Sequence, residues 1–95
     1  MNSADAGIVA SCTASWVVEH DTAVGNGRVR HTATTVATCQ FECVNTDQCS
    51  GFDWNPRIQP TGQCWLNGPW SGDTKREFTG VTHYSKTCDG TVYRT

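Results

Sequence analysis

The sequence has no long hydrophobic run and no excess of charge of one sign. No apolar segment approaches the roughly twenty residues that a membrane-spanning helix needs. Seven Lys and Arg residues against nine Asp and Glu residues give a net charge of −2, which supplies no general attraction to nucleic acid or to acidic membranes. We therefore expect no nucleic-acid partner and no membrane insertion.

The start of the chain lacks both parts of a secretory signal. Residues 1–5 contain no basic side chain, and the apolar run Ile8, Val9, Ala10 is too short for a signal-peptide core. The chain also lacks an Asn-x-Ser/Thr glycosylation sequence. Residues 1–11 are small and polar, and we expect them to form a disordered N-terminal segment.

The sequence patterns of enzymes and metal sites are missing as well. There is no Gly-x-Ser-x-Gly motif, and the three histidines His20, His31 and His83 are scattered along the chain. The cysteine spacing C-x3-C-x5-C differs from the C-x2-C and C-x4-C pairs typical of zinc sites. We therefore expect no catalysis, no metal and no cofactor.

Cysteine, in contrast, is abundant, with six in 95 residues. A chain this short buries a modest core, and small secreted domains often add disulfides to it. The even count indicates three bridges formed in an oxidising compartment and leaves no unpaired thiol as a nucleophile. We therefore predict a secreted protein, and the missing signal sequence leads us to interpret it as one module of a larger chain.

Four of the cysteines fall in residues 34–66, around which the rest of the chain is organised. Cys39 and Cys43 are four residues apart, so they share one face of a helix predicted over about residues 35–45. Thr34 or Thr35 supplies the N-cap, and the turn-forming residues 45–47 end the helix.

Several other segments have the features of strands. After Cys49 the pattern has period two, with Phe52 and Trp54 on one face and Asp53 on the other, where we expect it at the surface. In residues 80–88 one face carries Val81 and His83. The strands predicted in this way cover residues 12–18, 28–32, about 52–54, 63–66 and 80–88, with residues 75–78 as a charged connector.

The run TCQFECVNTDQCSGFDW followed by QCWL resembles the PAN/apple domain, and the segments GFDW and CWLNGPW look most like modules of invertebrate secreted or adhesive proteins. The outer cysteines, Cys12 and Cys88, match the third bridge of the apple type, so the resemblance covers residues 12–88. It implies an α+β fold, a disulfide-stapled curved antiparallel sheet with one helix packed across it. Residues 89–95 would then form a C-terminal tail.

Six cysteines allow fifteen pairings, and their spacing alone does not choose among them. Two cysteines on one helical face should reach different elements, Cys49 can fold back over the helix end, and the outer cysteines should lie on neighbouring strands. These arguments favour the pairing that the resemblance also implies, which is Cys39–Cys64, Cys43–Cys49 and Cys12–Cys88.

Large aromatic residues are frequent for so small a domain. Trp16 and Trp54 are interpreted as core residues. Trp70 lies between two turn signals, where it either forms an exposed contact or folds back over the sheet. The candidate ligand-binding residues are Trp70, Trp65, Tyr84, Arg28 and Arg30, and Asp53, Asn55 and Asn67 are possible partners of sugar hydroxyls.

The resemblance implies an extracellular recognition module whose partner is an extracellular protein or a glycan. We rank binding of a protein or matrix partner, without catalysis, first and carbohydrate binding second. A third interpretation, from a different class, is a structural spacer within a larger matrix protein.

Overall fold

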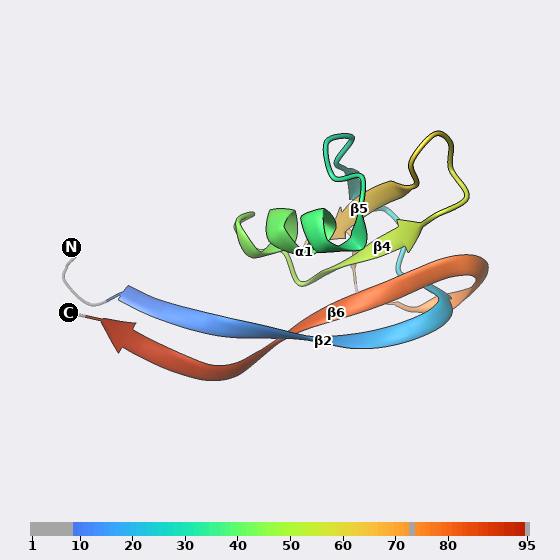
Figure 1. Ribbon diagram of the computed structural model, residues 1–95. Helices are drawn as coiled ribbons and strands as arrows, with labels where there is room; N and C mark the ends of the chain where they lie inside the picture. Colours follow the sequence, from blue (N-terminus) through green and yellow to red (C-terminus); the bar gives the residue numbers. More distant parts are fainter. Residues whose placement is uncertain (1–8, 73, 95) are drawn as a thin grey trace.

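The computed structural model describes residues 9–72 and 74–94, except for the side chains of residues 9–13 and 88–94. Within those residues one helix packs on a single antiparallel sheet of five strands, in the order β2-β6-β4-β5-β3 (Figure 1). This confirms the predicted α+β class. The elements along the chain are β2 (Val9–Ala23), β3 (Arg28–Val29), α1 (Val36–Val44), β4 (Gly51–Asn55), β5 (Gln63–Asn67) and β6 (Arg76–Arg94).

The helix begins and ends at residues that the sequence marks. Thr35 is the N-cap, and its hydroxyl accepts a hydrogen bond from the backbone N–H of Thr38, while the Thr38 hydroxyl accepts from the N–H of Thr35. At the other end, the backbone N–H and the side-chain amide of Asn45 both donate to the carbonyl of Phe41. The helix α1 is not long or apolar enough to cross a membrane, nor is any other helix in the described residues.

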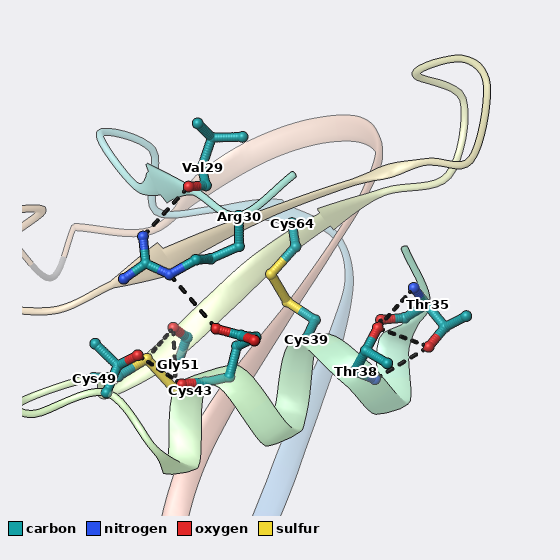
Figure 2. The surroundings of a disulfide bond; sticks show 11 residues. Val29, Arg30, Thr35, Thr38, Cys39, Cys43, Cys49, Gly51 and Cys64 are labelled. Carbon is teal, nitrogen blue, oxygen red and sulfur yellow. Dashed lines mark hydrogen bonds and ion pairs between the residues drawn. A yellow bond between two sulfur atoms is a disulfide. The ribbon is translucent and has the colours of Figure 1, made fainter. Parts of the chain in front are cut away.

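Two disulfides fix the inner side of the helix. Cys39 is bonded to Cys64 of β5 and Cys43 to Cys49, with Cα–Cα distances of 5.9 and 5.3 Å (Figure 2). These are two of the three predicted bridges. The third, Cys12–Cys88, involves side chains that lie outside the described residues, so it stays a prediction.

The sheet face under the helix carries the apolar core. Phe52 is fully buried, stacks on Tyr84 of β6 at 4.6 Å between ring centroids and meets the edge of Trp16 at 5.4 Å. Trp54, two residues after Phe52, is also buried, as its interpretation as core requires, and Trp16 is half-buried against this cluster. The period of two in β4 therefore sends both large aromatics to the helix side.

Strands β2 and β6 are longer than the sequence predicted. β2 continues past Val18 to Ala23, and β6 begins at Arg76, inside the predicted connector 75–78. Pairing runs from Val9 opposite Arg94 to Ala23 opposite Arg76, so residues 9–11 and 89–94 are strand, although a disordered segment and a tail were expected. Backbone hydrogen bonds to a neighbouring strand hold a polar segment as firmly as an apolar one. A polar strand shows no alternation of apolar and polar residues, so the sequence pattern does not reveal it.

The strand β3, in contrast, is shorter than the sequence predicted. The sequence predicted a strand over residues 28–32, and only Arg28–Val29 pair with β5. The next residues bend toward the helix, with the carbonyl of Arg30 accepting from the N–H of Ala33, which is buried in the core. This turn ends the strand.

Candidate binding site on the open face of the sheet

The five predicted binding residues do not form one site. Trp70 and Arg28 do meet, because the Arg28 guanidinium lies 4.0 Å from the centroid of the Trp70 ring. The indole N–H donates to the carbonyl of Leu66 at 3.0 Å, and the ring covers Gly68 so closely that a Cβ there would lie 2.6 Å from it. Trp70 is thus half-buried and packed against the core, at the end of β5.

The other three predicted residues lie elsewhere. Arg30 forms an ion pair with Glu42 of the helix at 3.8 Å and donates to the carbonyl of Val29 (Figure 2). Tyr84 belongs to the aromatic cluster under the helix. Trp65 alternates to the opposite side of the sheet, which we call the open face because no helix of the described residues covers it.

A polar row crosses the open face. The strand register places Glu19 of β2 opposite His83 of β6, His83 opposite Asp53 of β4, and Asp53 opposite Trp65 of β5. His83 Nδ1 and Asp53 Oδ1 are 2.8 Å apart, and both residues are 3% exposed. The prediction that Asp53 lies at the strand surface is therefore wrong, because a loop covers it.

That loop, residues 24–27, is held in place by hydrogen bonds to the Asp53 carboxylate. The N–H of Val24 donates to Oδ1 at 3.1 Å and that of Gly25 to Oδ2 at 2.9 Å. On the other side of the loop, the Asn67 amide donates to the carbonyl of Gly25 and the Ser71 hydroxyl to that of Asn26. Gly25 and Asn26 have φ of 80° and 52°, which Gly and Asn adopt more readily than other residues. The loop is therefore held in one shape above the sheet.

The two carboxyls in this row, those of Asp53 and Glu19, both have a lowered pKa, because hydrogen bonds outweigh the effect of burial. Burial raises the pKa of Asp53, but hydrogen bonds from His83, Gly25 and Val24 outweigh it and hold that pKa below its ordinary value. For Glu19, the hydrogen bond and charge of Lys75, whose Nζ is 2.7 Å from Oε1, lower the pKa. Asp53 is thus a charged anchor for the loop.

An Asp–His pair also occurs in the catalytic triads of hydrolases, where the histidine faces substrate. Here both side chains are buried, and the carboxylate is occupied by the loop N–H groups as well as by His83. The pair therefore positions the backbone of residues 24–25. The described residues contain no cluster of three or more His, Cys, Asp or Glu side chains that could hold a metal ion.

Beside this loop the open face is hollowed into a pocket of about 370 Å³. Its walls are mainly apolar, and Phe78 at its edge is 51% exposed. Arg76 lies against the loop, since a Cβ at Gly25 would be 2.7 Å from its Nη2. The apolar lining comes from Ala23, Ile58, Trp65, Phe78 and Val81, and the polar lining from Asn26, Asp53, Asn55 and Arg76.

Sequence reasoning identified part of this pocket. Trp65 is one of the candidate binding residues predicted from the sequence, and Asp53 and Asn55 are the possible partners of sugar hydroxyls. The sequence marks Lys75 and Arg76 as a small basic group, which we interpret as part of a solvated loop rather than as a site for an acidic partner. Phe78 is not among the candidates, because residues 75–78 are interpreted as a charged connector. Residues 76–78 are Arg, Glu and Phe, which do not alternate between polar and apolar, so no local pattern marks this segment as a strand.

One disulfide ties the helix to one face of the antiparallel sheet, and a second joins the end of the helix to the segment that follows it. With a preformed pocket on the other face, these features define a small disulfide-stapled binding module. The family model of the PAN domain matches residues 12–88, and the chain belongs to the PAN domain family. Comparison with curated proteins and with solved structures gives no significant match. PAN domains are protein- or carbohydrate-binding modules of extracellular proteins, and the family is a binding module rather than a catalytic one.

Proposed function

We propose that this PAN domain binds a protein or matrix partner outside the cell, as one module of a larger secreted chain, and that the open-face pocket is its contact site. The observation that carries the proposal is the apolar lining of that pocket beside an exposed Phe78. Side chains of a protein partner fill such a recess and bury it from water, which is the main source of affinity in protein interfaces.

Rigidity of the site supports the same function. The wall formed by residues 24–27 is fixed by hydrogen bonds to Asp53, Asn67 and Ser71, so little conformational freedom is lost when a partner binds. The pocket is thus formed before the partner arrives.

Carbohydrate binding is the second candidate. Trp65 is half-buried in the pocket, and Asn26 and Asn55 line it too, so an aromatic face and amide groups are available to one sugar ring. The mainly apolar lining favours a protein, because each sugar hydroxyl that enters the pocket needs a polar partner.

A pull-down from the native extracellular fluid, run beside a glycan array, tests the proposal with one matched pair of variants. Phe78→Ala removes an exposed Phe from the pocket, and Phe41→Ala removes a Phe that is 65% exposed on the helix. We expect a captured protein to be lost with Phe78→Ala and retained with Phe41→Ala. Glycan hits lost with Phe78→Ala would support the carbohydrate alternative, and no ligand in either assay would support the spacer interpretation.

The stack of Arg28 on Trp70 remains a second proposed contact surface. If Trp70 is a contact, Trp70→Ala should leave the melting temperature nearly unchanged and weaken partner binding by about 2 kcal/mol, near thirtyfold. If its main role is packing against the core, the same change should cost about 3 to 5 kcal/mol of the free energy of unfolding and move the binding function away from it.

A further inference from the structure

One cation, Arg76, lines the open-face pocket and has no partner among the described residues. Elsewhere in the described residues Lys75 is paired with Glu19, Arg30 is paired with Glu42, and Arg28 lies over the Trp70 ring. Arg57 and Lys86 form no ion pair with a described residue either, but they do not line the pocket. Arg76 lines the pocket and forms no ion pair or hydrogen bond with any described residue. Its guanidinium lies against Gly25, whose missing side chain leaves room for it.

The carboxylate inside the pocket does not compensate this cation. Both oxygens of Asp53 already accept hydrogen bonds, Oδ1 from Val24 and His83 and Oδ2 from Gly25. The strand neighbour Glu77 alternates to the other side of β6 and does not line the pocket. The guanidinium therefore offers its N–H donors to whatever enters the pocket.

The size and lining of the pocket limit the kinds of ligand that can bind in it. About 370 Å³ lies near the lower end of the roughly 300–1,000 Å³ typical of ligand pockets, so the recess takes a single large side chain rather than a polymer. Ile58, Phe78 and Val81 give that side chain apolar contacts. An Arg–carboxylate pair at the rim would add two parallel charge-assisted hydrogen bonds.

We propose, on the basis of the proposed protein-binding function, that the ligand is an acidic peptide segment. An apolar or aromatic side chain enters the pocket, and the carboxylate of a neighbouring Asp or Glu in the same segment binds Arg76. Arg76 is then the residue that determines specificity, whereas the apolar walls supply affinity to acidic and neutral segments alike.

An NMR titration with two capped tetrapeptides tests this inference. One is glycyl-phenylalanyl-aspartyl-glycine, the other has asparagine in place of aspartate, and the indole N–H of Trp65 is the reporter. We expect the acidic peptide to bind about tenfold more tightly. Arg76→Gln should reduce its affinity to that of the neutral peptide, while Arg76→Lys should keep part of the preference.

The matched control is Lys75→Gln, which removes the neighbouring cation outside the pocket and should leave the preference intact. Equal affinity of the two peptides, with binding still lost in Phe78→Ala, would overturn the inference and leave protein recognition at the pocket standing. Binding of methyl glucuronide in place of both peptides would overturn the inference and support the carbohydrate alternative. Absence of any shift at Trp65 would also overturn it, and the pull-down with Phe78→Ala then decides the proposed function separately.

Discussion

The two faces of the sheet are built in different ways from the same strands. On the helix face, a fully buried Phe52 and the Cys39–Cys64 bridge hold helix and sheet together without polar side chains. On the open face, Asp53 and His83 are buried as a hydrogen-bonded pair that holds a loop, and beside them a pocket stays open. Alternation within β4 thus separates the residues that stabilise the fold from those that shape the site.

This division has a physical basis. Burial of apolar area and covalent links stabilise a small domain without leaving polar groups unpaired. A rigid polar loop beside an apolar recess contributes less to stability, but it presents fixed groups to a ligand. Substitutions on the two faces should therefore have different consequences, and four predictions test the comparison.

The largest loss of stability is expected from Phe52→Ala. The ring is fully buried between Trp16 and Tyr84, so its removal leaves a cavity and should lower the free energy of unfolding by about 3 to 5 kcal/mol. Urea unfolding followed by tryptophan fluorescence measures it. A loss below about 1 kcal/mol would mean that the aromatic cluster is not the centre of the core.

The second prediction concerns the disulfide between helix and sheet. In the loop-entropy model, the separation of 25 residues makes Cys39–Cys64 worth about 3.5 kcal/mol, against about 2.4 kcal/mol for Cys43–Cys49 with its separation of six. Cys39→Ser with Cys64→Ser should therefore destabilise the domain more than Cys43→Ser with Cys49→Ser. Thermal unfolding of the two double variants gives the order, and the reverse order would show that the short bridge is the more important one.

On the open face, Asp53→Asn should cost about 1 to 3 kcal/mol, because an amide offers donors where Gly25 and His83 also donate. The folded-state pKa of Asp53 is lowered, so its stabilising contribution is fully present above the unfolded pKa of about 3.9 and is lost as the pH falls through the folded value. The stability difference between wild type and variant should thus be constant from pH 5 to 7 and shrink below pH 4.

The pH dependence of Asp53 has one internal control. Glu19 also has a lowered pKa, through Lys75, so the acid unfolding curve of Glu19→Gln separates the two carboxyls. A difference between wild type and Asp53→Asn that grows on acidification would contradict the assigned sign.

The smallest effect on stability is expected from Phe78→Ala. The side chain is half-exposed at the pocket edge, so the free energy of unfolding should change by less than about 0.5 kcal/mol while partner binding is lost. Differential scanning fluorimetry and the pull-down measure the two quantities on the same sample. A destabilisation of 2 kcal/mol would assign Phe78 to the core and leave the pocket without its exposed anchor.

Much of the helix face could be predicted from the sequence, because its features depend on residues that are close together in the chain. The i, i+4 spacing of Cys39 and Cys43, the Thr35 cap and the alternation of Phe52 with Trp54 are each fixed within a few residues. The family resemblance gave the same fold, and the domain match covers the predicted residues 12–88.

The open face could not be predicted in the same way, because distant segments build it. Loop 24–27 is held over the sheet by hydrogen bonds to Asp53, Asn67 and Ser71, and Asp53 and Asn67 are 28 and 42 residues away from Gly25 in sequence. Phe78 reaches the pocket because an irregularity between His20 and Thr22 changes the register between β2 and β6. Of the five candidate binding residues, Trp70 and Arg28 do meet, but Trp70 packs against the core and not in the pocket.

The long ribbon of β2 and β6 has a mechanical consequence. Val9 lies opposite Arg94, so the two strands leave the fold side by side (Figure 1). Tension that pulls residues 9 and 94 apart would act parallel to the inter-strand hydrogen bonds. The pairs of hydrogen bonds would then break one after another from this end, and each step would need only a small force. The predicted Cys12–Cys88 bridge would stop this opening after a few residues, so that the pocket and the disulfide-linked core carry no load.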